Sequence, residues 1–159
     1  MEQKTFAKLI KAIIIGVGIC GLFIYLYIIP DWGSELVAKS PEFGYCYLPW
    51  LIFLWITAIP CYAVLCLGWK ITTNIGNDKS FSRDNANLLK WIAAFAAGDS
   101  LFFFVGNVVL LFCNMNHPGI LVASMIIVFA GVSITIVAAA LSHLVRKAAI
   151  LQEQADLTI

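Results

Sequence analysis

The segment Gly119–Leu144 reads GILVASMIIVFAGVSITIVAAALSHL and contains no Asp, Glu, Lys or Arg. An α-helix needs about 17–25 mostly apolar residues to cross the hydrocarbon core of a bilayer, which is roughly 30 Å thick. Apolar side chains occupy every face of this segment, as they do in a helix that is surrounded by lipid and by other helices. The sequence therefore predicts a transmembrane helix at this position.

Three further apolar runs of similar length precede this segment, at Ala12–Ile29, Leu48–Trp69 and Leu88–Cys113. The first run has 18 residues, more than the roughly 7–15 of a signal peptide, so we expect it to remain as a membrane anchor. We expect an all-α polytopic membrane protein, a single domain made of four transmembrane helices in an up-down bundle. The expected helices are 12–29, 48–69, 88–113 and 119–144, and the domain is residues 1–159.

Short polar stretches separate the four runs, and their Gly, Pro and Asn residues are typical of turns. These stretches are Pro30–Gly33, Asn74–Asp78 and Asn114–Pro118. After the fourth run, apolar residues recur near helical spacing at Leu144, Ala148, Leu151 and Ala155. This pattern predicts that the fourth helix continues over about 145–156, and that the final residues 156–159 leave the helix or add a short extended end.

The composition of the whole chain excludes a water-soluble globule. Hydrophobic residues make up 62% of the 159 residues and charged residues 12%, against about 45–50% and about 25% in soluble proteins. Disordered chains are poor in apolar residues, so disorder is excluded as well. The net charge of +1 gives no basic excess, and we expect no direct binding to nucleic acid.

The Lys and Arg residues predict the orientation, because cationic loops resist translocation across the membrane. Nine of the ten fall in the N-terminal segment, the loop between the second and third runs with its helix ends, and the C-terminal tail; the tenth is Lys39. These three regions lie on one side of a chain with four spans. We expect a multi-pass protein of the cell membrane with its N- and C-termini in the cytoplasm.

The inner loop and the tail carry a resemblance. Lys79-Ser80-Phe81-Ser82, followed by Asn85 and by Leu88-Leu89-Lys90, resembles the inner-loop signature of a bacterial four-helix membrane family known as domain of unknown function 2975. The ending 151–159 is also similar to that family's usual end, although Gln154 and Ala155 stand where a second acidic residue often follows Glu153. The resemblance implies a bacterial membrane protein without an assigned activity, often encoded beside a small helix-turn-helix regulator. It lends no catalytic residue.

Asp99 is the one carboxylate inside the four runs, and the one Lys or Arg within them, Lys90, lies at the inner end of the third run. It comes 11 residues after Leu88, about 16 Å into the core, near the bilayer midplane. We expect a neutral carboxyl that faces the bundle interior. Pro60 lies at similar depth and should kink the second helix, because it cannot donate a hydrogen bond to Ile56. Two interpretations stay open: a polar midplane pocket, or a carboxyl that only joins two helices. The pocket residues would be Asp99, Ser100, Asn107 and Pro60.

The sequence gives little support to an enzyme, a metal site or a cofactor. Ser142 and His143 are adjacent, and adjacent helical residues point about 100° apart, so they do not form a nucleophile–base pair. His117 and His143 fall on opposite sides of the membrane and cannot share a metal ion. Cys46 and Cys113 share a depth near the outer face, which leaves a disulfide open.

Three functions remain from the sequence. The first is a regulatory or interaction protein whose inner loop and tail bind a partner, for which a small helix-turn-helix regulator is the candidate. The second is an oligomeric transporter or channel subunit with a midplane polar site at Asp99, and the third is an immunity or membrane-stress protection protein. A homo-oligomer is compatible with each. The interaction candidates are Lys79, Phe81, Ser82, Arg83, Asn85, Arg146, Lys147, Gln152 and Glu153.

Overall fold

The structure, a computed structural model, describes residues 3–156, and these residues contain helices and short loops but no strand. The chain runs through α1 (Gln3–Phe23), a π-helical stretch (Ile24–Ile28), α2 (Ile29–Lys39), a 3-10 turn (Pro41–Phe43), α3 (Gly44–Gly76), α4 (Arg83–Phe112) and α5 (Pro118–Asp156). Four helical stretches among the described residues are long and apolar enough to span a membrane. This confirms the predicted fold class with its four transmembrane helices.

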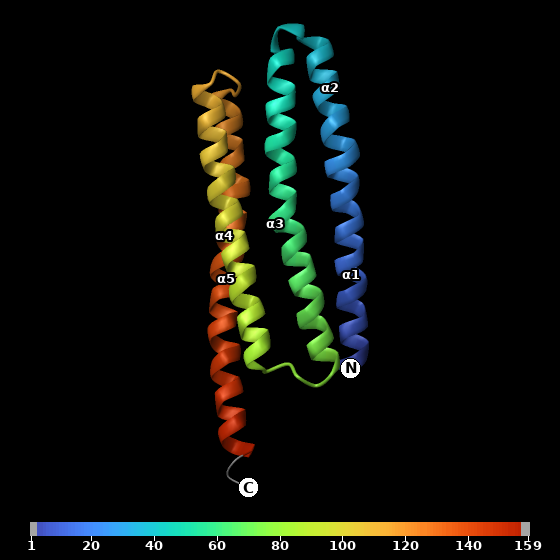
Figure 1. Cartoon of the computed structure of the whole chain (residues 1–159), viewed down its shortest axis with the longest axis vertical. Coiled ribbons are helices and arrows are strands. Elements are labelled where there is room, and N and C mark those ends of the chain that lie inside the picture. The colour runs from blue at the N-terminus through green and yellow to red at the C-terminus, as the bar shows by residue number, and fades with distance from the viewer. Residues whose placement is uncertain (1–2, 157–159) are drawn as a thin grey trace.

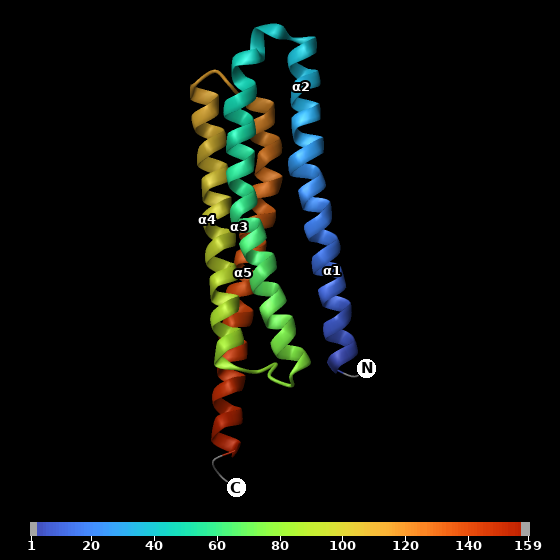
Figure 2. The ribbon, with the colours of Figure 1, turned by 45° about the vertical axis from the view of Figure 1, so that its right-hand side comes forward.

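The long helices run antiparallel in chain order. The N-terminus, the loop between α3 and α4 and the C-terminus lie at one end of the molecule (Figure 1). Backbone contacts join α1 to α3, α3 to α4 and α4 to α5. Within residues 3–156, no Cα atom of α1 or α2 lies within 8 Å of one in α5. The first and last helices of this series, α1 and α5, therefore each have one side that no other helix covers. In the view of Figure 2, α1 lies along the edge.

Large apolar side chains cover the outside of the molecule. Ile126 and Phe129 of α5 are 73% and 74% exposed, and Phe112 at the end of α4 is 82% exposed. Such a surface would aggregate in water, whereas it matches the hydrocarbon of a bilayer. The few buried residues are mostly small or polar, and they lie between adjacent helices. The fold thus keeps its apolar surface for lipid and its close contacts for small side chains.

The turn predicted at Pro30–Gly33 is wrong, because the helix continues through these residues to Lys39. The π-helical stretch before Pro30 explains the difference: its wider turn pairs each N–H with the carbonyl five residues back, as the N–H of Ile29 does with Ile24. Pro30 has no N–H for the carbonyl of Tyr25. The indole N–H of Trp55, on α3, donates to that oxygen at 2.9 Å instead.

The fourth helix continues well beyond the apolar segment, as predicted. With 39 residues at about 1.5 Å each, α5 is roughly 58 Å long, about twice the thickness of the hydrocarbon core. Its last turns extend past the ends of the other helices (Figure 1). The predicted helical tail over 145–156 is therefore confirmed as helix. The ending expected to leave the helix lies, from residue 157 on, outside the described residues.

Candidate functional site

The loop between α3 and α4 is held in one conformation by the side chain of Asn85. Asn85 is 1% exposed, and its amide nitrogen donates to the carbonyls of Lys79 and Ser80, both at 3.0 Å. Its amide oxygen accepts from the side chain of Asn74 at 2.7 Å. Ser82 is the N-cap residue of α4, and its hydroxyl accepts from the N–H of Asn85 at 3.2 Å. The loop is therefore ordered from both ends.

An ion pair joins this loop to the extension of α5. The guanidinium of Arg83 lies 2.6 Å from the carboxylate of Glu153, with both side chains more than half exposed. An exposed pair of this kind contributes about 0–1 kcal/mol to stability, so its main effect is to fix where the α5 extension lies. One turn into α4, the hydroxyl of Ser142 donates to the carbonyl of Ala86 at 2.7 Å and holds α5 against α4.

We call residues 79–85 together with residues 146–153 the loop–tail surface. Its predicted members fall into two groups. Ser82 and Asn85 build the loop, because their side chains are engaged in the bonds described above. The others have exposed side chains, and Phe81 is 60% exposed. The exposed members are Lys79, Phe81, Arg83, Arg146, Lys147, Gln152 and Glu153.

A second candidate site lies between α3 and α4 at Asp99. One carboxylate oxygen, Oδ2, accepts from the thiol of Cys61 on α3 at 3.7 Å. The other, Oδ1, is buried and has no hydrogen-bond partner. A groove of about 160 Å³ opens beside it. We call this the Asp99 groove; it is lined by Ile56, Pro60, Ala94, Phe95, Gly98, Asp99 and Phe102.

The four predicted pocket residues do not all lie together in the structure. Asp99 and Pro60 line the same groove. Ser100 donates to the carbonyl of Ala96 at 2.7 Å and lies against Gly131 of α5. Asn107 is fully buried, donates to the carbonyl of Phe103 at 2.8 Å and accepts from the side chain of Asn116 in the next loop at 3.2 Å. Successive helical residues point about 100° apart, so Ser100 turns away from Asp99 and towards α5.

Three polar neighbours of this region were not among the predicted site residues. Cys61 on α3 contacts Asp99. One turn earlier on α3, Thr57 shares a hydrogen bond of 3.2 Å with the hydroxyl of Tyr25 in the π-helical stretch. The i, i+4 spacing of Thr57 and Cys61 places them on one helix face, and that spacing was the available signal.

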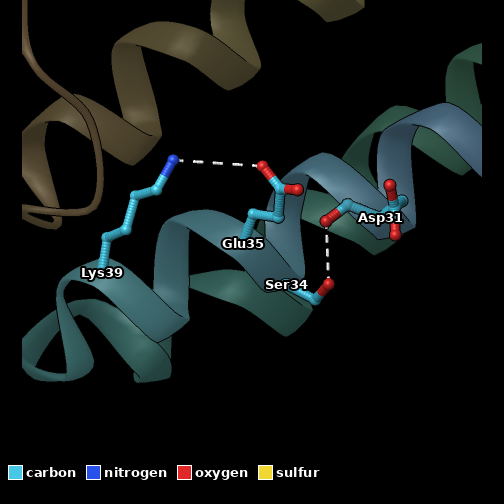
Figure 3. Close-up of polar contacts among 4 residues, drawn as sticks. All are labelled: Asp31, Ser34, Glu35 and Lys39. Carbon is cyan, nitrogen blue, oxygen red and sulfur yellow. Dashed lines mark hydrogen bonds and ion pairs between the residues drawn. The ribbon is translucent and has the colours of Figure 1, made fainter.

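A larger hollow of about 260 Å³ lies at the opposite end of the molecule, along α2. It is lined by Trp32, Glu35, Leu36 and Lys39. Figure 3 shows the ion pair between Lys39 and Glu35, at 4.0 Å, and the hydroxyl of Ser34, which donates to the carbonyl of Asp31 at 2.8 Å. All lining residues come from successive turns of one exposed helix, so the hollow brings together no groups from different elements.

Neither a disulfide nor a group of metal ligands occurs among residues 3–156. All five cysteines have free thiols, so Cys46 and Cys113 are not joined. Among residues 3–156, no three His, Cys, Asp or Glu side chains are grouped so that they could hold a metal ion.

Comparisons with known proteins identify a family and a similar membrane protein. A family model described as a protein of unknown function, DUF2975, matches residues 33–159. The chain is similar to the uncharacterized membrane protein YoaS of Bacillus subtilis (strain 168), with 32% identity over 160 residues and 99% of each chain covered. No solved structure matches the chain.

Proposed function

This chain belongs to the DUF2975 family of membrane proteins of unknown function, and we propose that it acts as a non-enzymatic interaction protein through its loop–tail surface. The observation that supports the proposal is that hydrogen bonds and an ion pair fix the loop between α3 and α4. Asn85 bonds two loop carbonyls and Arg83 bonds Glu153, so the surface exists before any partner arrives. A preformed surface binds without the entropic cost of ordering a loop.

We also propose an orientation, in which the protein is a multi-pass protein of the cell membrane with the loop–tail surface and both termini in the cytoplasm. Nine of the ten Lys and Arg residues belong to the segments at that end of the molecule, and Lys39 belongs to the other. Such a bias orients bacterial membrane proteins with their cationic segments inside. The partner would then be a cytoplasmic protein.

The chemistry of the surface indicates what it would bind. Phe81 offers an exposed aromatic ring, and three exposed cations belong to the same loop and tail: Lys79, Arg146 and Lys147. Aromatic residues and cations on a preformed loop suit a partner with an apolar pocket and acidic groups around it. A small helix-turn-helix regulator, the kind of gene often found beside this family, is the partner we propose.

We propose no catalytic role for the residue pairs that could suggest one. Ser142, the hydroxyl beside His143, donates to a backbone carbonyl of α4 and serves helix packing. Arg83 and Glu153 neutralise each other at the surface. A partner-binding role requires neither a nucleophile nor a cofactor.

The test measures binding of the purified helix-turn-helix regulator to the full-length protein in detergent, by biolayer interferometry. Phe81→Ser should weaken binding about 10- to 100-fold, since burial of a Phe side chain contributes about 1.5–3 kcal/mol. Phe43→Ser is the matched control, because Phe43 is 54% exposed at the opposite end. Absence of binding by the unmodified protein, or an equal loss in both variants, would contradict the proposal.

A further inference from the structure

The Asp99 groove has a chemistry that the proposed cytoplasmic role does not use. It lies between α3 and α4, far along both helices from the loop–tail surface, and its lining residues Ile56, Phe95 and Phe102 are exposed. Asp99 is its one charged side chain, and neither ion pair of residues 3–156 involves it.

Asp99 has a carboxylate oxygen without a hydrogen-bond partner, and the carbonyl of Ile56 lacks its regular helical donor. The Oδ1 atom of Asp99 is buried without a partner, while Cys61 occupies the other carboxylate oxygen. The carbonyl of Ile56 would pair with the N–H of residue 60 in an unbroken helix, and Pro60 has none. Ile56 and Asp99 both line the groove. A buried acceptor that is left unpaired costs about 1–3 kcal/mol, so a donor placed here would be held firmly.

The walls of the groove are apolar and aromatic. Phe95 and Phe102 come from the turns of α4 on either side of Asp99. A Cβ atom added to Gly98 would meet nothing within 4 Å, so the groove is open along that side. A volume of about 160 Å³ is that of a small groove, which suits a ligand no larger than a single ring. Aromatic faces attract cations, and the attraction grows where water is excluded.

We propose that the Asp99 groove binds a protonated amine with a small apolar body, taken up from the bilayer. The ammonium group supplies both the positive charge that Asp99 lacks and the N–H donors that its Oδ1 and the Ile56 carbonyl lack. The body of the ligand lies between the rings of Phe95 and Phe102. The carboxyl of Asp99, expected to be neutral in the empty groove, is ionised when the cation lies beside it. An anion gains no such pairing, and a neutral hydrocarbon brings no hydrogen-bond donor.

The experiment uses the full chain in phosphatidylcholine nanodiscs, with 4-fluorophenethylamine as the probe and ¹⁹F NMR as the measurement. We expect saturable binding that Asp99→Asn weakens at least tenfold. Asp31→Asn, which removes an acid at the outer end, should bind like the unmodified protein. The neutral probe 1-ethyl-4-fluorobenzene has the same ring without the ammonium group and should not compete.

A second variant tests the groove without removing the charge, in case Asp99→Asn impairs folding. Gly98→Leu adds a side chain to the open side and should block the probe, whereas Gly16→Leu adds the same side chain on α1, where a Cβ also meets nothing within 4 Å. Equal competition by the neutral probe would show that the groove takes hydrocarbon regardless of charge, and would overturn the proposal. Unchanged binding in both groove variants would overturn it as well.

Discussion

At the scale of single residues, the same defect, a carbonyl left without its helical N–H by a proline, has two outcomes in this protein. Before Pro30, the carbonyl of Tyr25 accepts from the indole of Trp55. Before Pro60, the carbonyl of Ile56 also loses its helical N–H, and Ile56 lines the groove of Asp99, whose Oδ1 has no hydrogen-bond partner. Buried acceptors are normally paired. The fold itself therefore supplies a donor for the carbonyl before Pro30. Near Pro60, in our proposal, a bound ligand would supply the donor.

The amide of Asn85 shows how one residue can decide the shape of a surface. It donates to two loop carbonyls and accepts from Asn74, so it uses both of its ends. Aspartate has nearly the same shape but no donor. Part of the family-like signature at 79–85 is thus a structural requirement of the loop, and it leaves Lys79 and Phe81 exposed.

We predict that Asn85→Asp releases the loop. Both loop carbonyls lose their donor and face a carboxylate oxygen instead, which should lower the free energy of unfolding by about 1–3 kcal/mol. Hydrogen exchange of the amides in residues 77–82 should speed up. Asn77→Asp is the control, since Asn77 is exposed and its substitution leaves these bonds in place. Slow exchange in the Asn85 variant would show that the loop is held by other contacts.

At the scale of helices, close approach depends on glycines that face large or polar neighbours. A Cβ atom at Gly106 would overlap the ring of Phe53, and one at Gly131 would overlap the hydroxyl of Ser100. The first glycine sets the spacing of α3 and α4, and the second that of α4 and α5. Small residues have this role in membrane proteins because no hydrophobic effect drives helices together in lipid.

We predict that Gly131→Ala destabilises the contact between α4 and α5, by about 1–3 kcal/mol, because the new methyl group overlaps the Ser100 hydroxyl. Adding Ser100→Ala removes that hydroxyl, and the remaining Cβ atom lies 3.3 Å away. The double variant should therefore recover much of the lost stability. Unfolding in mixed detergent measures it, with Gly16→Ala as the control in open space. Equal stability of the single and double variants would contradict this account.

The four helices were predictable because apolar length alone decides whether a segment spans a bilayer. The turn expected at Pro30–Gly33 was not, since the effect of Pro30 depends on the π-helical turn before it and on Trp55 from another helix. For the candidate site, depth placed Asp99 beside Pro60. Which helix Ser100 and Asn107 would face depended on neighbour relations that one sequence does not contain.

At the scale of the whole molecule, the two ends of the helix bundle differ both in charge and in shape. The end that carries the loop between α3 and α4 also carries the α5 extension and both termini (Figure 1). At this end the ammonium of Lys11 lies 4.9 Å from the centre of the Trp69 ring, a cation–aromatic contact typical of a membrane interface. The opposite end has Asp31, Glu35 and Glu42 with the single cation Lys39. A membrane potential and a translocation machinery would both distinguish these two ends.

We predict that the cationic end lies in the cytoplasm. Alkaline phosphatase is active only outside the cytoplasm, so a fusion after Ser40 should be active and a fusion after Ser80 inactive. Replacing Lys4, Lys8 and Lys11 by Gln should reduce the difference between the two fusions, because it removes three of the nine cations that oppose translocation. Immunoblots of the fusions control for expression. The reverse pattern in the unmodified chain would place the loop–tail surface outside the cell and remove the basis for a cytoplasmic partner, while leaving amine binding at Asp99 to be decided by its own test.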